Sequence, residues 1–194
     1  FPLAAEWLEE HLQVHPTRYE DLRELDLSAT SLKDQSKLLT KLPRGLSKLV
    51  WFPTMNRTLD LPFHLLPPRL NWLSCKSFAI EELSCLKELT TLNVILTSRG
   101  DWMKFLPPTL TQCKVRHHNH PGNRASLASK LSWHLLPRSL LLLDSGIEDV
   151  LEPEHLTALP PGLLELSLSP PSVLKEHAAL LPRSLTAACN LFTS

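Results

Sequence analysis

The chain has 194 residues, 43% of them hydrophobic, which is long and apolar enough for one folded domain with its own core. Lys and Arg total 20 and Asp and Glu total 20, so no overall charge would attract nucleic acid or an anionic membrane. The apolar runs fall far short of the roughly 18 residues that a membrane-spanning helix needs, so we expect no membrane insertion.

Residues 1–21 predict a capping helix. Leu3, Trp7, Leu8 and Leu12 fall on one helical stripe, and acidic residues lie on the opposite side. Such a helix would cover the open end of a repeat array. The stretch FPLAAEWLEEHL carries three Glu and no Lys or Arg, which is unlike the basic start of a signal or transit peptide.

A phrase that begins with Leu-Pro recurs six times along the rest of the chain, as in LPRGLSKLVWF from Leu42 and LPPGLLELSLS from Leu159. Two further segments, from Leu22 and Leu89, carry the same LxxLxL core without the Leu-Pro. The cores follow one another at an average spacing of about 23 residues, within the period of known repeat classes. Their first leucines are Leu22, Leu46, Leu70, Leu89, Leu110, Leu140, Leu163 and Leu185.

This pattern resembles the leucine-rich repeat superfamily, and its LPxSLxxLxL form is most similar to FNIP-type repeats. The resemblance implies an α/β fold, a solenoid with a curved parallel sheet on its concave side and short helices on its convex side. Residues 22–194 would form about eight irregular repeats, in one domain with the cap at 1–21. The family usually has Asn eight residues after the first Leu of each core. The residues at that position here are Thr30, Thr54, Phe78, Thr97, His118, Glu148 and Pro171.

Within each repeat, the L-x-L core predicts a short strand whose leucines point inward, such as Leu166 and Leu168 or Leu25 and Leu27. The proline three residues before the core lacks a backbone donor and favours an extended predecessor, so it should stop the preceding segment. Leucines at helical spacing after a capping serine predict helices between the strands. Such segments begin at Ser31, Ser77 and Ser172.

The variable positions between the inward leucines would form the concave face. In the middle repeats these positions are basic and aromatic, and Trp and Arg are enriched where binding energy concentrates. We therefore predict a surface that binds a protein partner, although a solvated face with scattered apolar residues would show the same pattern. The predicted partner-binding residues are Lys48, Phe52, Trp72, Lys76, Gln112, Lys114 and Arg116, with Val50 and Ser74 in the same rows.

Charge is segregated along the chain. Residues 99–138 carry seven basic side chains against one acidic one, for a net charge of +6, and residues 139–179 carry one against seven, for −6. In a solenoid these segments become neighbouring bands of opposite sign. The bands either neutralise each other or dock a partner.

The string RHHNHPGNR contains His117, His118 and His120 and invites a metal site. No second group of carboxylates or thiolates at ligand spacing accompanies it, and it falls in the longest repeat, where an extended polar loop is expected. We therefore predict a polar loop and no metal site.

The four cysteines form no CxxC pair and no dense framework, so we expect free thiols in a reducing, intracellular compartment, which could be the cytoplasm or the interior of an organelle. Cys75 and Cys113 take inward positions, which predicts that they are buried small hydrophobic residues.

Signatures of catalysis are missing from the sequence. It contains no GxSxG, phosphate loop or HExxH motif, and its five glycines do not cluster. Asp144, Glu148 and Asp149 are close in sequence and are interpreted as a solvated strand end. We predict no catalytic residue and no cofactor.

These observations favour a non-enzymatic interaction module or scaffold, a subunit of a larger intracellular assembly that binds protein and not nucleic acid. The alternative, motivated by resemblance of the LPPxLxxL form to repeats of bacterial effectors, is the substrate-recognition region of a ubiquitin ligase or another enzyme whose catalytic domain lies outside these residues.

Overall fold

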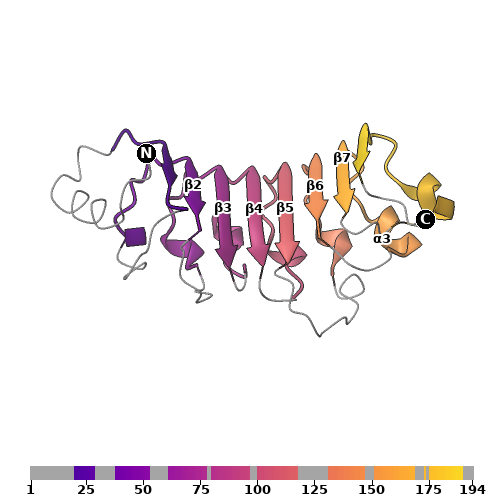
Figure 1. The fold of residues 1–194 in the computed structure, drawn as a ribbon, viewed down its shortest axis with the longest axis horizontal. Coiled ribbons are helices and arrows are strands. Elements are labelled where there is room, and N and C mark those ends of the chain that lie inside the picture. Colours follow the sequence, from indigo (N-terminus) through magenta and orange to yellow (C-terminus); the bar gives the residue numbers. More distant parts are fainter. Residues whose placement is uncertain are drawn as a thin grey trace.

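The computed structural model describes residues 20–28, 38–52, 61–77, 80–96, 100–117, 131–146, 151–168, 173 and 175–189. Within these ranges, eight parallel strands form one sheet, and each strand pairs with the next along the chain (Figure 1). This order confirms the predicted solenoid. The predicted capping helix falls on residues that lie, up to residue 19, outside the described ranges. The strands are β1 (Glu24–Asp26), β2 (Lys48–Trp51), β3 (Trp72–Ser77), β4 (Thr91–Leu96), β5 (Gln112–His117), β6 (Leu142–Ser145), β7 (Glu165–Leu168) and β8 (Ala187–Cys189).

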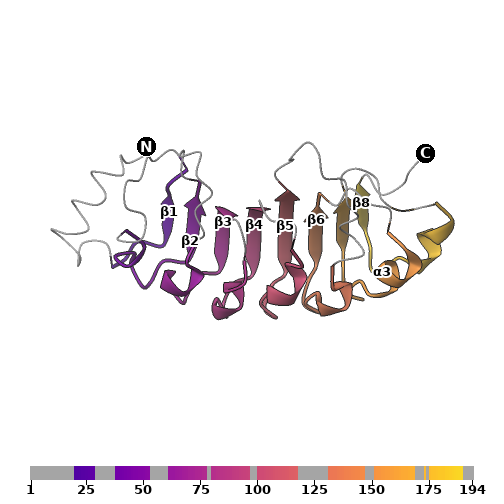
Figure 2. The ribbon, with the colours of Figure 1, turned by 90° about the horizontal axis from the view of Figure 1, so that it is seen from below.

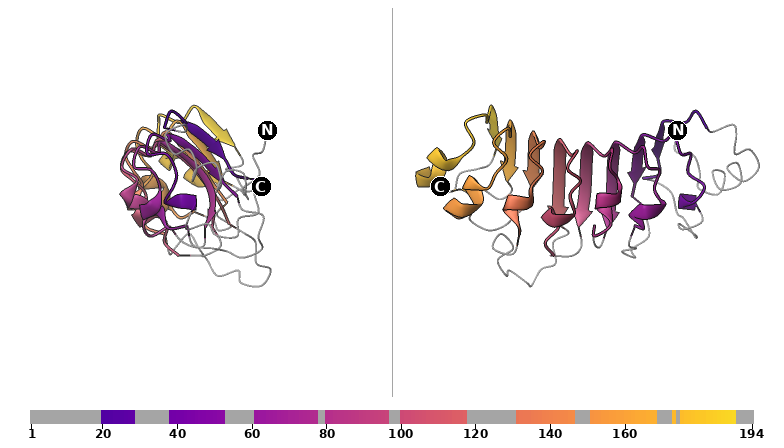
Figure 3. Two further views of the ribbon diagram at one scale, coloured as in Figure 1. Left: turned by 90° about the vertical axis from the view of Figure 1, so that its left-hand side faces the viewer. Right: turned by 180° about the vertical axis from the view of Figure 1, so that it is seen from behind.

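Short helices follow the strands and line the side of the solenoid away from the sheet (Figures 2 and 3). Within the described ranges, no helix is long and apolar enough to cross a membrane. Most are single turns of 3-10 helix, labelled η, and α3 is the one α-helix whose full bounds are described. These elements are η2 (Phe63–Leu65), η3 (Leu83–Cys85), η4 (Met103–Phe105), η6 (Trp133–Leu135), α3 (Pro153–Thr157) and η7 (Lys175–Leu180).

The prediction of a helix that begins at a capping Ser77 is wrong. Ser77 is the last residue of β3, and the helix in this repeat is only η3, closed by a bond from the Leu86 amide to the Leu83 carbonyl at 3.0 Å. A period of about 20 residues leaves little chain between consecutive strands, and a 3-10 turn advances farther per residue than an α-helix. The other two capping serines lie outside the described residues.

The Leu-Pro phrase forms a tight turn that leads into each strand. The carbonyl of each proline accepts the amide of the leucine three residues later, for example from Leu46 to Pro43 at 3.0 Å and from Leu163 to Pro160 at 3.1 Å. Of the two repeats without Leu-Pro, the one from Leu89 makes the same turn, from the Leu89 amide to the Leu86 carbonyl at 3.1 Å. The proline therefore ends the preceding segment, as predicted, and its carbonyl also holds the turn.

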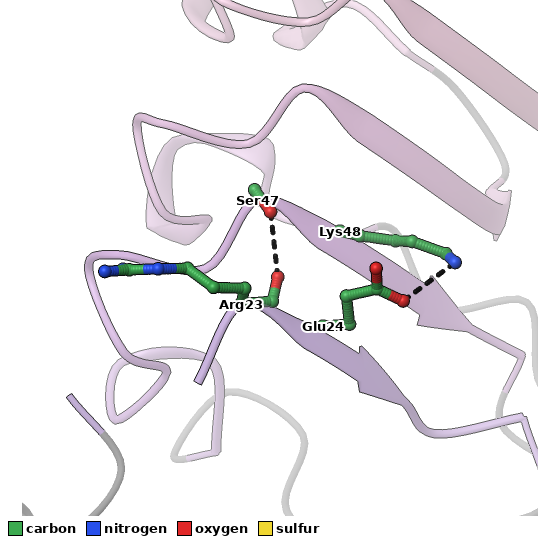
Figure 4. Close-up of polar contacts among 4 residues, drawn as sticks. All are labelled: Arg23, Glu24, Ser47 and Lys48. Carbon is green, nitrogen blue, oxygen red and sulfur yellow. Dashed lines mark hydrogen bonds and ion pairs between the residues drawn. The ribbon is translucent and has the colours of Figure 1, made fainter. Parts of the chain in front are cut away.

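A ladder of hydrogen bonds at the start of the strands fixes the register between repeats. The Arg23 carbonyl accepts the amides of Ser47 at 2.8 Å and Lys48 at 2.9 Å, and this pairing recurs from repeat to repeat. Where the residue is Ser or Thr, its hydroxyl adds a third bond, as from Ser47 Oγ to the Arg23 carbonyl at 3.0 Å (Figure 4). Equivalent side-chain positions therefore stack in straight rows. The seven positions where Asn is missing all lie outside the described residues.

The core is a continuous stack of leucines between the sheet and the short helices. The predicted inward residues Leu25, Leu27, Leu166 and Leu168 are all buried, which confirms the strand register. The last described repeat departs from this pattern, since Ala188 of β8 is exposed although it pairs in register with buried Leu166.

Candidate interaction surface on the sheet

The outward side chains of the sheet form three rows, because equivalent residues pair from strand to strand. This arrangement brings the predicted residues of β2, β3 and β5 onto one face. Phe52 directly follows β2 and is half-buried. The first row is Glu24, Lys48, Trp72, Thr91, Gln112, Leu142, Glu165 and Ala187; the second is Asp26, Val50, Ser74, Asn93, Lys114, Asp144, Ser167 and Cys189; the third includes Lys76, Ile95 and Arg116.

Trp72 and Lys48 are in direct contact at the N-terminal end of this face. The Lys48 ammonium lies 5.3 Å from the centroid of the Trp72 ring, within the range of a cation–π interaction. The same ammonium is 2.9 Å from Glu24 Oε2 (Figure 4). Lys48 therefore flanks the indole, with its charge already paired. Glu24 balances the charge of Lys48, and Lys76 lies four residues along β3, in register with Ile95.

A hollow of about 420 Å³ opens beside Trp72, lined by the outward residues of β1 to β3 and by Leu25. Asp26 lies in this lining, and the Ser28 amide donates to its carboxylate at 2.9 Å. That backbone hydrogen bond lowers the pKa of Asp26, so the group is ionised near neutral pH. The hollow therefore presents a half-exposed indole beside carboxylates.

The basic residues of β5 differ in their pairing. Arg116 Nη2 lies 2.8 Å from Asp144 Oδ2 of β6, so this ion pair joins the positive and negative bands of the chain. Such pairing is the mutual neutralisation predicted as one explanation of the bands. Lys114 and Gln112 are exposed, and neither makes an ion pair or side-chain hydrogen bond within the described part of the chain.

Asp144 corrects a further expectation. Its side chain is only 13% exposed and lies within β6, so it is not part of a solvated strand end. Glu148 and Asp149, which were grouped with it, lie outside the described residues.

The prediction that the histidine-rich string binds no metal concerns residues that lie mostly outside the described ranges. His117 ends β5, and His118 and His120 lie outside the described ranges. Among the described residues, no group of three His, Cys, Asp or Glu side chains is placed to hold a metal ion.

The prediction that Cys75 and Cys113 are buried is confirmed. All four cysteines are free, and Cys75 and Cys113 are fully buried. Burial raises the pKa of the Cys75 thiol to about 12 and also raises that of Cys113. Both are poor nucleophiles, because the reactive form of a thiol is the thiolate.

The acidic members of the face were missed by sequence reasoning. Glu24, Asp26 and Glu165 occupy the same outward positions as the predicted basic residues, but in repeats at the two ends of the sheet. Extending the L-x-L register from the middle repeats to every repeat would have found them.

Comparisons with known proteins bear on the fold. No family model matches the sequence, and no curated protein matches it. A crystal structure described as CroV588, a novel circular LRR protein, is similar over 87% of this chain, with 19% sequence identity and a TM-score of 0.51. The match covers 27% of that protein, so this chain spans about a quarter of its length.

A second similar structure is an internalin (inlF) from Listeria monocytogenes, with 14% identity and a TM-score of 0.35 over 87% of this chain and 68% of that one. The narrower likeness to FNIP-type repeats stays a prediction. The parallel strands in chain order, the leucines buried behind β1 to β7 and the likeness to the circular protein show that this chain has the leucine-rich repeat fold.

Proposed function

We propose that the chain is a protein-interaction module that holds a protein partner on the concave face of its sheet. In this role it is a non-catalytic scaffold or subunit of a larger intracellular assembly. The observation that carries the proposal is Trp72, a half-exposed indole on a sheet face, positioned by the Lys48 ammonium beside an open hollow.

The physical argument is one of preorganisation. An indole offers a large apolar surface with a donor at its edge, and tryptophan is enriched among residues that dominate binding energy. The paired strands fix its backbone, and the cation–π contact with Lys48 restricts its ring. Little conformational entropy is then lost on binding, which is a main cost of association.

The free thiols support the intracellular part of the proposal. None of the four cysteines is in a disulfide, and two occupy core positions, Cys75 in register with Val94 and Cys113 in register with Leu92. Extracellular proteins of modest size more often use cysteine in disulfides.

The test compares Trp72→Ala with Lys175→Ala, a change on η7, away from the sheet. Each tagged protein captures partners from a native lysate of the source cells, and quantitative mass spectrometry compares the captured sets. We expect Trp72→Ala to weaken partner binding by about 2 kcal/mol, roughly thirtyfold. Lys175→Ala should capture the wild-type set.

Circular dichroism of each variant keeps the result interpretable. Loss of folding in Trp72→Ala would show that the indole belongs to the core. A folded Trp72→Ala variant that captures the wild-type set would contradict the proposal, and loss of capture with Lys175→Ala alone would place the partner on the convex side.

A further inference from the structure

The outward face of β6 to β8 contains a groove that the partner-binding prediction did not include. Small side chains lie there: Ala187 in the first row, which holds Lys48 and Trp72 elsewhere, and Ser167 and Cys189 in the second row. The space they leave has a volume of about 160 Å³. Its lining also includes Leu142, Asp144 and Glu165, with Lys114 of β5 on the opposite rim.

The groove holds carboxylate oxygens that lack donors. Asp144 Oδ2 is bound by Arg116, but Asp144 Oδ1 is buried and has no hydrogen-bond partner among the described residues. A buried acceptor without a donor is unfavourable, and more so when the group is charged. Glu165, one strand further, is exposed and makes no ion pair with any described residue. Both groups would gain from a cationic donor.

Two exposed leucines form an apolar patch directly before β6 and β7, the strands that line the groove. Leu141 and Leu164 are 42% and 39% exposed. They are neighbours, because the Leu164 amide donates to the Leu141 carbonyl at 2.8 Å. Other repeats place Thr90 or Thr111 here, whose hydroxyls bond to the preceding repeat. Two adjacent leucines in place of hydroxyl groups give up those bonds and expose apolar surface.

We propose that this groove binds a basic, extended segment of the partner protein, with an arginine or lysine directed at Asp144 and Glu165. An aliphatic residue beside that cation covers Leu141 and Leu164. The inference rests on the proposed function, since it names the chemistry of a partner held on the same face. The Arg116–Asp144 pair is neutral as a whole, so Asp144 offers the guest its free acceptor Oδ1, and the negative charge that attracts the cation is that of Glu165. Lys114 opposes the guest cation, so the cation lies toward β7.

The experiment uses two acetylated and amidated peptides, Ser-Leu-Arg-Leu-Arg-Ser and its acidic counterpart Ser-Leu-Glu-Leu-Glu-Ser. Binding to the full chain is followed by amide chemical shifts in NMR at low ionic strength. We expect the basic peptide to shift the amides of β6, β7 and β8, and the acidic peptide to bind at least tenfold more weakly.

Three charge variants test the assignment. Glu165→Lys should weaken the basic peptide about tenfold or more, because it replaces an attractive charge by a repulsive one. Lys114→Glu should strengthen it by removing the opposing cation. Glu88→Lys is the matched control; this exposed residue of the turn before β4 makes no described contact, and its change should have little effect.

Equal binding of the two peptides, or equal effects of Glu165→Lys and Glu88→Lys, would overturn the inference. Shifts confined to strands other than β6 to β8 would overturn it as well. Failure here is distinguishable from failure of the proposed function, because the peptide assay does not depend on Trp72. If Trp72→Ala abolishes partner capture but the basic peptide does not bind, the proposed function is supported and the groove inference is wrong.

Discussion

Leu166→Asp should unfold the domain, because it puts a charge into a stacked core. Leu166 is 1% exposed, and its register neighbours Leu143 and Ala188 carry no charge to compensate a carboxylate. Removing a buried leucine side chain costs about 2–5 kcal/mol. A buried carboxylate without a partner adds several kcal/mol, unless it takes up a proton. The total is comparable with the about 5–15 kcal/mol that stabilises a typical domain.

The matched control is Leu141→Asp, which makes the same substitution in a neighbouring repeat at a leucine that is 42% exposed. Its stability should change by about 1 kcal/mol or less, as is usual for surface substitutions. Thermal unfolding followed by circular dichroism compares the two variants with the wild type. A wild-type melting temperature for Leu166→Asp, or equal loss in both variants, would refute the assignment of inward and outward positions.

Two further results are expected from titratable side chains. Cys75 and Cys113 should react slowly with a thiol reagent in the native protein and quickly in denaturant, because both are buried. Exposed Cys189 should react quickly under both conditions. Fast labelling of Cys75 and Cys113 in the native protein would contradict the core packing. His64 Nδ1 lies 2.6 Å from Glu82 Oε2 and lowers the pKa of that carboxyl, so His64→Ala should raise it toward its ordinary 4.5 in a carboxyl NMR titration. Because the pKa of Glu82 is lower in the folded state, its contribution to the stability of the fold is present above pH 4.5 and is lost as the pH falls through the folded-state pKa. An unchanged Glu82 pKa in the His64→Ala variant would contradict the contact.

The repeat architecture could be predicted because it depends on residues that recur. Leucine at each core position and a turn ahead of each strand fix the strand, its inward face and its register. In that register Trp72 lies beside Lys48 and Thr91, as in the structure. The 3-10 helices were harder to predict, since leucine spacing alone does not distinguish one 3-10 turn from a short α-helix.

The electrostatics of the face could not be predicted from the row assignments alone. The sequence alone does not show whether an outward basic side chain has an ion-pair partner. In the structure, Lys48 pairs with Glu24 and Arg116 pairs with Asp144, each on a neighbouring strand. These partners lie 24 and 28 residues away in the sequence, about one repeat length. Only comparison of outward positions between successive repeats connects them.

The two features of the concave face can belong to one binding surface. Trp72 lies on β3 and Glu165 on β7, both in the first row, so four strand spacings separate them. Neighbouring strands lie about 4.8 Å apart, which places the two positions about 19 Å from each other along the face. An extended segment advances about 3.3 Å per residue, so about six residues suffice to reach from the indole to the groove. One extended partner segment that crosses the strands could therefore contact both features, with an apolar residue at one end on Trp72 and a basic residue at the other end in the groove beside Glu165. The straight first row makes this possible, because the bonds between repeats hold every intervening residue in line.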